Sequence, residues 1–417
     1  VAKRIRRYTH TCNNSITIPS FFSNRYHDEK KMLQVIAAIF IVIFFIPYTA
    51  SGFAACGKLF SSLFGVKYLT AMIISAIVIV AYTTLGGFLA ASTTDFIQSI
   101  IMSVALIVVL IFGVETAGGI GAVIHNASEL PGYLSMTLSY DVNTGKAAPY
   151  SALTIVSTAA WGLGYFGMPH ILLRFMAIED EKKLKLSRRV ATIWVVISLF
   201  VAVFIGVIGY TMSKVGALEM LTGSNSETII VKISALLSQH GVIFALLAGV
   251  ILAGILASTM STSDSQLLAA SSAVSSDILG AFRKDSSNKN GSMAAARITL
   301  LVISVVAAFI ARNPDSSVFA IVSFAWAGFG AAFGPVVLFS LFWKRTNKWG
   351  ALAGMVCGGS MVFIWKYLIR PLGGIWNIYE LLPAFLIACA AIVIVSLLTP
   401  KPSKEIEEEF DRVAQMK

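Results

Sequence analysis

The chain has 417 residues, of which 57% are hydrophobic and only 13% are charged. Its mean hydropathy is +0.80. Soluble domains carry about one quarter charged residues, so this composition excludes an ordinary soluble domain and indicates an integral membrane protein. The net charge of +11 would suit a nucleic-acid partner, but membrane topology explains it without one, as the charge distribution shows.

Ten apolar stretches are long enough to cross a bilayer as helices, because a span needs about 20 residues. They cover residues 33–61, 67–90, 96–117, 150–176, 190–213, 241–275, 295–312, 317–343, 349–369 and 379–399. The sixth stretch exceeds one span, so we expect its end to project beyond the membrane. The sequence therefore predicts an all-α polytopic membrane protein, with one transmembrane domain over 1–400 and a charged tail over 401–417.

Lysine and arginine are distributed unevenly between the two sides that this topology defines. If the N-terminus is inside, the inside segments hold 24 of the 32 basic residues. These segments are 1–33, 88–96, 174–190, 276–297, 343–349 and the tail. The positive-inside rule then places both termini in the cytoplasm.

Two features of the first three spans could serve a function. Pro47 and Tyr48 precede a run of small residues, which predicts a kinked helix with the Tyr48 hydroxyl directed toward a central cavity. Asp95 follows a Gly86-Gly87 turn at the start of the third span. An acid inside a membrane is a functional candidate, but the preceding Ser-Thr-Thr also fits a helix N-cap, and both interpretations stay open.

Residues 161–170, WGLGYFGMPH, predict a broken helix because they contain three glycines and Pro169. Irregular backbone at membrane depth is tolerated only where it is buried or lines a cavity. Transporters bind substrate at such breaks through free backbone groups. Trp161 and Tyr165, four residues apart, could face the same cavity. The alternative is a kinked packing helix with ordinary aromatic side chains.

The segment Ile251–Leu268 is the most informative part of the chain. Its small hydroxyl residues share one face of an apolar helix, and they are Ser258, Ser261, Thr262 and Ser265. A hard cation such as sodium needs several oxygen ligands, which carbonyls and hydroxyls provide without burying a full charge. The alternative is hydrogen bonding between helices. Asp264 extends the hydroxyl stripe and is a further functional candidate.

The other motifs are less specific. Residues 324–335, FAWAGFGAAFGP, suit a gate or hinge, although tight helix packing explains three glycines and four alanines more simply. The four cysteines are scattered, and no nucleotide-binding loop or paired nucleophile and base is present, so neither a metal centre nor an enzyme is expected.

These residues together resemble the sodium/solute symporter family, and within it the bacterial sodium/proline symporters. The resemblance extends from Val1 to about Pro400 and is strongest in FFIPYTASG (44–52), GGFLAASTTDF (86–96), WGLGYFGMPHILLRFMA (161–177), ILASTMSTSDSQLL (255–268) and SFAWAGFGAAFGPVVLFSLFWKR (323–345). It implies the inverted-repeat fold shared with the neurotransmitter-sodium symporters. It also implies sodium-coupled uptake of L-proline across the plasma (inner) membrane of a bacterium.

The resemblance also implies a role for each candidate residue. The sodium ligands would be the hydroxyls of Ser261 and Thr262 and the backbone carbonyl of Ser258. The substrate pocket would be formed by Tyr48, Trp161, Tyr165 and Pro169. Asp95 matches an acid implicated in sodium dependence. Asp264 would either help to bind a second cation with Asp95 or contact cytoplasmic water.

Several alternatives remain open. The solute could be pantothenate, a sugar, sialic acid or another amino acid, and the chain could be a membrane sensor or a structural remnant. The family has thirteen helices, whereas ten are predicted here, and the chain begins at Val1 with a basic stretch. We therefore expect an N-terminally truncated protein that does not transport by itself.

Overall fold

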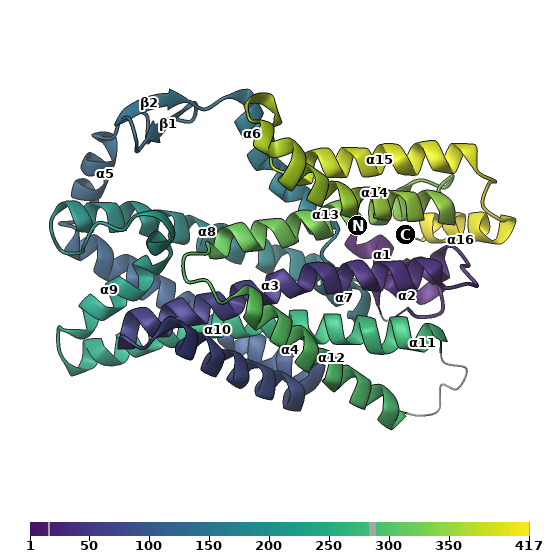
Figure 1. The fold of residues 1–417 in the computed structure, drawn as a ribbon, viewed down its shortest axis with the longest axis horizontal. Helices are drawn as coiled ribbons and strands as arrows, with labels where there is room; N and C mark the ends of the chain where they lie inside the picture. Colours follow the sequence, from purple (N-terminus) through teal and green to yellow (C-terminus); the bar gives the residue numbers. More distant parts are fainter. Residues whose placement is uncertain (16, 283–288, 417) are drawn as a thin grey trace.

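Apolar helices run between the two ends of an elongated bundle, as the hydropathy pattern predicts (Figure 1). The computed structural model describes the whole chain except residues 16, 283–288 and 417, and it describes no side chains at 86–92 and 289–292. In the described residues, nine helices are long and apolar enough to cross a membrane.

The elements follow one another from the N-terminus to the broken helix in this order: α1 (Ala2–Thr11), α2 (Ile18–Arg25), α3 (Met32–Phe64), α4 (Tyr68–Thr116), α5 (Ile120–Ser128), β1 (Leu138–Asp141), β2 (Lys146–Pro149), α6 (Ala152–Ala159), the 3-10 turn η1 (Ala160–Phe166) and α7 (Pro169–Ala177). Strands β1 and β2 form a short antiparallel hairpin.

The remaining elements are α8 (Lys183–Lys214), η2 (Gly223–Thr228), α9 (Ile229–Ser238), α10 (Val242–Ser272), α11 (Leu279–Phe282), α12 (Lys289–Ile310), α13 (Val318–Phe342), α14 (Lys348–Ile364), α15 (Leu381–Leu398) and α16 (Lys404–Gln415). A π-helical turn at Ala273–Ile278 joins α10 to α11. The helix therefore continues to Phe282, beyond residue 275, where the predicted sixth stretch ends.

The ten predicted stretches correspond to nine spanning helices and one broken helix. Residues 150–176 form α6, η1 and α7, so that span is interrupted as predicted. The second and third stretches both lie in α4, whose apolar spans are Tyr68–Leu85 and Thr93–Thr116. The hydroxyls of Tyr82 and Thr94 touch, although twelve residues of straight helix cover about 18 Å, so these two spans fold back on each other.

The core lies around α13, which packs against α3, α14 and α15. Helix α13 continues through Pro335, and its glycines allow close contact: a Cβ at Gly328 would collide with the ring of Phe44. This favours the tight-packing interpretation of residues 324–335.

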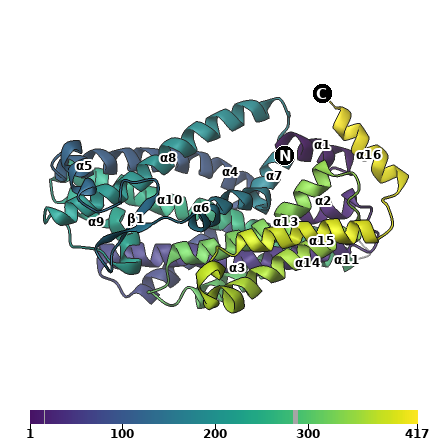
Figure 2. The ribbon, with the colours of Figure 1, turned by 90° about the horizontal axis from the view of Figure 1, so that it is seen from above.

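Both termini lie at the same end of the bundle (Figures 1 and 2). The tail, predicted only as charged, forms helix α16, which buries Ile406, Phe410 and Val413 and packs against α1. Arg7 of α1 donates to the carbonyl of Met416 at the end of the tail. The sequence patterns of single segments did not predict this packing.

Candidate functional site

The break between α6 and α7 has a local cause and a tertiary cause. Pro169 begins α7, where its missing N–H removes no hydrogen bond. A Cβ at Gly164 would collide with the ring of Trp326, and a Cβ at Gly167 would collide with the carbonyl of Phe329. Only glycine allows this backbone to lie directly against α13. The predicted break is therefore confirmed, and α13 is the element that supports it.

Both aromatic candidates at the break contact Trp326. The Trp161 ring stacks on the rings of Trp326 (5.4 Å between centroids), Phe319 (5.5 Å) and Tyr379 (5.7 Å). The Trp326 indole N–H donates to the Trp161 carbonyl over 2.9 Å. Tyr165 contacts Trp326 edge-on at 4.8 Å and remains 48% exposed.

A cavity of about 520 Å³ lies beside the break. Tyr165, Ser258 and Thr259 line it, together with apolar residues of α4, α8, α9 and α10, but Trp161 does not. The structure thus brings one predicted substrate residue and one predicted sodium ligand to the same cavity. It places Trp161 in the aromatic stack instead of the cavity wall.

Tyr48 lies on α3, near the start of α7. Its side chain is buried, and its ring contacts the ring of His170 edge-on at 6.2 Å. Pro169, the residue before His170, is buried as well. Tyr48 and Pro169 therefore lie in the same region, at the N-terminus of the second half of the broken helix.

The hydroxyl stripe of α10 converges on one backbone oxygen. Both Ser261 Oγ (3.1 Å) and Thr262 Oγ1 (3.0 Å) donate to the carbonyl of Ser258. Three oxygen atoms are consequently gathered on one turn of helix. Neither hydroxyl has a hydrogen-bond acceptor on another helix among the described residues, so the hydroxyls do not act as interhelical links here.

The two acids predicted within the membrane have different surroundings. Asp95 lies in α4, near the start of the span Thr93–Thr116, and its Oδ2 pairs with Arg174 Nη2 at 2.7 Å. The same Arg174 nitrogen donates to Ser265 Oγ at 3.2 Å. Asp264 is 0% exposed, which contradicts the idea that it contacts cytoplasmic water: its carboxylate is covered by packed helices.

Asp264 also has no hydrogen-bond partner for either carboxylate oxygen among the described residues. Three other polar side chains in this part of the structure are also buried and have unpaired polar atoms. Ser263 and Gln266 lie beside Asp264 on α10, and Thr49 lies on α3. Gly52 of α3 lies against Ser263, where a Cβ would collide with the serine hydroxyl. These unpaired polar groups on α3 and α10 lie close in sequence to the sodium candidates.

Arg174 was not among the sequence candidates, although an available signal pointed to it. It is a basic residue one turn after the predicted break, and ionisable residues within membrane segments are functional candidates. Through Asp95 and Ser265, it connects α7 with α4 and α10.

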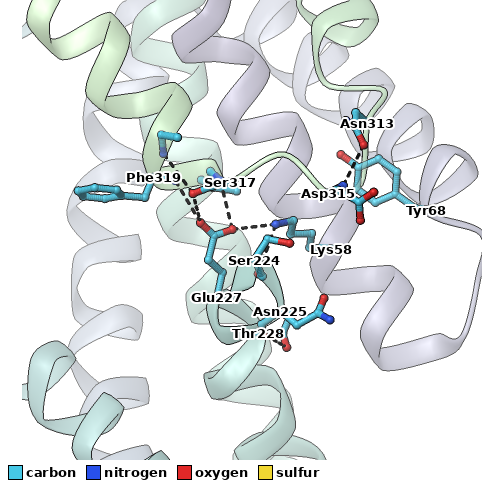
Figure 3. Close-up of polar contacts among 12 residues, drawn as sticks. Lys58, Tyr68, Ser224, Asn225, Glu227, Thr228, Asn313, Asp315, Ser317 and Phe319 are labelled. Atoms are coloured by element: carbon cyan, nitrogen blue, oxygen red, sulfur yellow. Dashed lines mark hydrogen bonds and ion pairs between the residues drawn. The ribbon is translucent and has the colours of Figure 1, made fainter. Parts of the chain in front are cut away.

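Glu227 was also not among the sequence candidates. It joins three elements (Figure 3) at the end of the bundle away from the two termini (Figure 1). Its carboxylate accepts from Lys58 Nζ (2.8 Å), Ser317 Oγ (2.8 Å) and the backbone N–H groups of Val318 and Phe319 (both 3.2 Å). Burial alone would raise the pKa of Glu227, but these hydrogen bonds outweigh it and lower the pKa. Glu227 thereby connects η2 to the end of α3 and the start of α13.

Comparisons with known proteins agree with this geometry. A model of the sodium:solute symporter family matches residues 1–358. The osmoregulated proline transporter OpuE of Bacillus subtilis is 38% identical over 97% of this chain and 78% of its own length. The high-affinity proline transporter PutP of the same bacterium is 40% identical, over 99% and 82%. The sodium/proline symporter of Salmonella typhimurium is 38% identical, over 98% and 78%.

A solved structure shows the same fold. It is a Na+-coupled sialic acid symporter in a substrate-bound outward-open state, which superposes with a TM-score of 0.72. The alignment covers 97% of this chain and 84% of that one at 16% identity, so the likeness concerns the fold alone.

Proposed function

The chain belongs to the sodium:solute symporter family, and on that premise we propose that it imports L-proline with sodium across the plasma membrane of a bacterium. The names of the relatives above support proline as the solute, since they are proline transporters at 38% and 40% identity over almost the whole chain. The reaction is secondary active transport, in which no covalent bond changes. The membrane potential supplies about 2.3 kcal/mol per sodium ion for each 100 mV.

We assign the sodium site to α10. The Ser261 and Thr262 hydroxyls and the Ser258 carbonyl form a group of neutral oxygens on one turn. Such a group can replace part of the hydration shell of a hard cation without burying a carboxylate beside it. The observation that carries the proposal is that Ser258 and Tyr165 line one cavity, so that a candidate sodium ligand and a candidate substrate residue lie next to each other.

The substrate site is assigned to the broken helix and α3, with Tyr48, Trp161, Tyr165 and Pro169. A pyrrolidine ring is apolar and packs well on aromatic rings, while a zwitterionic head group binds backbone dipoles at a helix break. Tyr165 is the aromatic side chain at the cavity wall. Trp161 would affect substrate binding indirectly, because its ring stacks on Trp326 and Trp326 contacts Tyr165.

Coupling between the two sites is assigned to Arg174. Its contacts with Asp95 and Ser265 connect the second half of the broken helix to α4 and to the helix that carries the sodium ligands. Breaking these contacts would release α7 toward one side of the membrane. We propose one coupled sodium at the hydroxyl site, and Asp264, unpaired and near Asp95, is the group through which a second cation would act.

The orientation is also a proposal. Both termini lie at the same end of the bundle, and the segments predicted to lie inside hold 24 of the 32 basic residues, which supports a cytoplasmic position for both termini.

Sodium-dependent uptake of radiolabelled L-proline in a proline-transport-deficient bacterium tests the function. The chain spans 78% and 82% of the length of the two Bacillus relatives, so we would compare it with the same chain preceded by three N-terminal membrane helices of a relative. We expect uptake that requires sodium and that excess pantothenate, sugar or sialic acid does not inhibit. Inhibition by one of these solutes with no effect of unlabelled proline would change the substrate assignment.

Trp161→Ala tests the pocket in the same assay. We expect the half-saturating proline concentration to rise about fivefold, because an aromatic contact is worth about 1 kcal/mol. Trp349→Ala is the matched control, since Trp349 lies at the start of α14 and is partly exposed. Equal effects of the two substitutions would remove Trp161 from the substrate site.

A further inference from the structure

The first two turns of α8 carry exposed basic side chains on the face that continues along the helix as an apolar stripe. Residues spaced by three or four positions share one helix face. We define the α8 stripe by this spacing, and its members are Lys182, Lys185, Arg189, Ile193, Val196, Phe200 and Val203. Every one of these residues is exposed in the structure. One uncovered face thus changes from basic to apolar along its length.

The position of this change matches the depth of a membrane boundary. Twenty-five residues separate Arg189 from Lys214 near the other end of α8, which corresponds to about 37 Å of helix. The hydrocarbon core of a bilayer is about 30 Å thick, with several more ångströms of head groups on each side. When the apolar part of the α8 stripe faces lipid tails, Lys185 and Arg189 therefore lie at the level of the head groups.

The acids of the preceding loop do not neutralise these cations. Glu179 pairs with Lys183, which points to another side of the helix, at 3.3 Å. Asp180 accepts from the backbone N–H of Lys182. Glu181 accepts two hydrogen bonds from Arg7 of α1, at 2.7 and 2.8 Å.

Among the described residues, no carboxylate lies within ion-pair distance of Lys182, Lys185 or Arg189. The basic end of the α8 stripe is therefore an uncompensated positive surface that adjoins the lipid-facing part of the helix. Water alone could solvate it, but its alignment with an apolar stripe fits a partner that is anionic at one end and apolar at the other.

We propose that Lys182, Lys185 and Arg189 bind the head groups of anionic phospholipids in the leaflet at this end of the bundle. Lysine and arginine near a negatively charged membrane surface each contribute about fivefold to binding. The acyl chains of the same lipids lie along Ile193, Val196 and Phe200. This inference depends only on the chain's insertion in a membrane, and it is independent of the transported solute.

The site has a structural connection to the broken helix. Residues 178–182 link α7 to α8, and the Arg7–Glu181 pair holds this link against α1. Helix α7 carries Pro169 and Arg174. An anionic lipid bound here therefore lies one short link away from the second half of the broken helix.

The test measures lipid selectivity on the purified chain in nanodiscs. Spin-labelled phosphatidylglycerol and phosphatidylcholine report which lipid is immobilised next to the protein. We expect preference for phosphatidylglycerol, and we expect K185Q/R189Q to reduce that preference roughly tenfold or more. The preference of the unaltered chain falls with added salt, because screening weakens charge contacts at the surface. Circular dichroism and the melting temperature establish that the variant is folded.

K401Q/K404Q is the matched control. It removes two exposed cations at the same end of the bundle, but Lys401 lies in the link after α15 and Lys404 begins α16, so neither lies on a spanning helix. Its lipid preference should equal that of the unaltered chain. An unaltered chain without lipid preference, or an equal loss in the control, would overturn the proposal. Release of phosphatidylglycerol by millimolar inorganic phosphate would likewise show a site for soluble anions instead of lipid.

Discussion

Glu227 and Asp264 are acidic side chains of the same bundle in opposite surroundings. Glu227 receives four hydrogen bonds from two other elements, one from Lys58 of α3 and three from the start of α13. Asp264 is fully buried and receives none from the described residues. Burying a charge without a partner is costly, whereas a paired carboxylate stabilises the elements that it joins. The comparison indicates a structural joint at Glu227 and a buried carboxyl group that joins no elements at Asp264.

The largest expected effect tests the structural joint. Glu227→Gln should lower the free energy of unfolding by about 2 kcal/mol, because it weakens charge-assisted hydrogen bonds and leaves Lys58 without its partner. Thermal unfolding in detergent measures it. Glu219→Gln is the control, since its pair with Lys232 is exposed, and a similar loss there would mean that Glu227 is an ordinary surface acid.

The second effect concerns sodium instead of stability. A chain with both Ser261→Ala and Thr262→Ala should need about tenfold more sodium for half-maximal uptake, equivalent to about 1.4 kcal/mol. Its thermal stability should change little, because both hydroxyls bond only to a carbonyl of their own helix. Ser304→Ala removes a comparable hydroxyl bond on α12 and should leave sodium dependence unchanged. Unchanged sodium dependence in the double variant would remove the site assignment.

The third effect should have the opposite sign to the first. Asp264→Asn removes an unpaired buried charge, so we expect the protein without sodium to gain about 1 kcal/mol of stability. Asp277→Asn is the contrasting control, because Asp277 is buried but accepts hydrogen bonds from Thr17 and Gln34. We expect that control to lose stability. A loss for both variants would show that Asp264 has a structural partner after all.

The smallest effect is the pH dependence of the Glu227 joint. Because folding lowers the pKa of Glu227 below its ordinary value of 4.5, the ionised form contributes stability above that pH. This contribution is lost as the pH falls through the lowered pKa. The difference in melting temperature between the unaltered chain and Glu227→Gln should therefore shrink below pH 4.5. A constant difference would mean that the charge of Glu227 does not matter.

Local patterns in the sequence were sufficient for the class of protein and most of its elements. A run of about 20 apolar residues forms a helix in lipid whatever its neighbours are, because backbone groups must be paired within the segment. The glycines and Pro169 likewise disfavour a continuous helix locally, so the break was predictable. The hydroxyl stripe of α10 follows from helical periodicity alone. Helix α9 and the β-hairpin were missed because they are short and lie outside the apolar spans.

Tertiary structure decided the contacts on which function depends. Arg174 meets Asp95 across 79 residues of sequence, and Glu227 meets the start of α13 across about 90. Trp161 stacks on Trp326 of α13, whereas Tyr165 lines the cavity, although the spacing of Trp161 and Tyr165 predicts a shared cavity. Sequence spacing fixes the direction of a side chain from its own helix. Only helix packing fixes what it meets there, since those partners come from segments whose local patterns carry no information about each other.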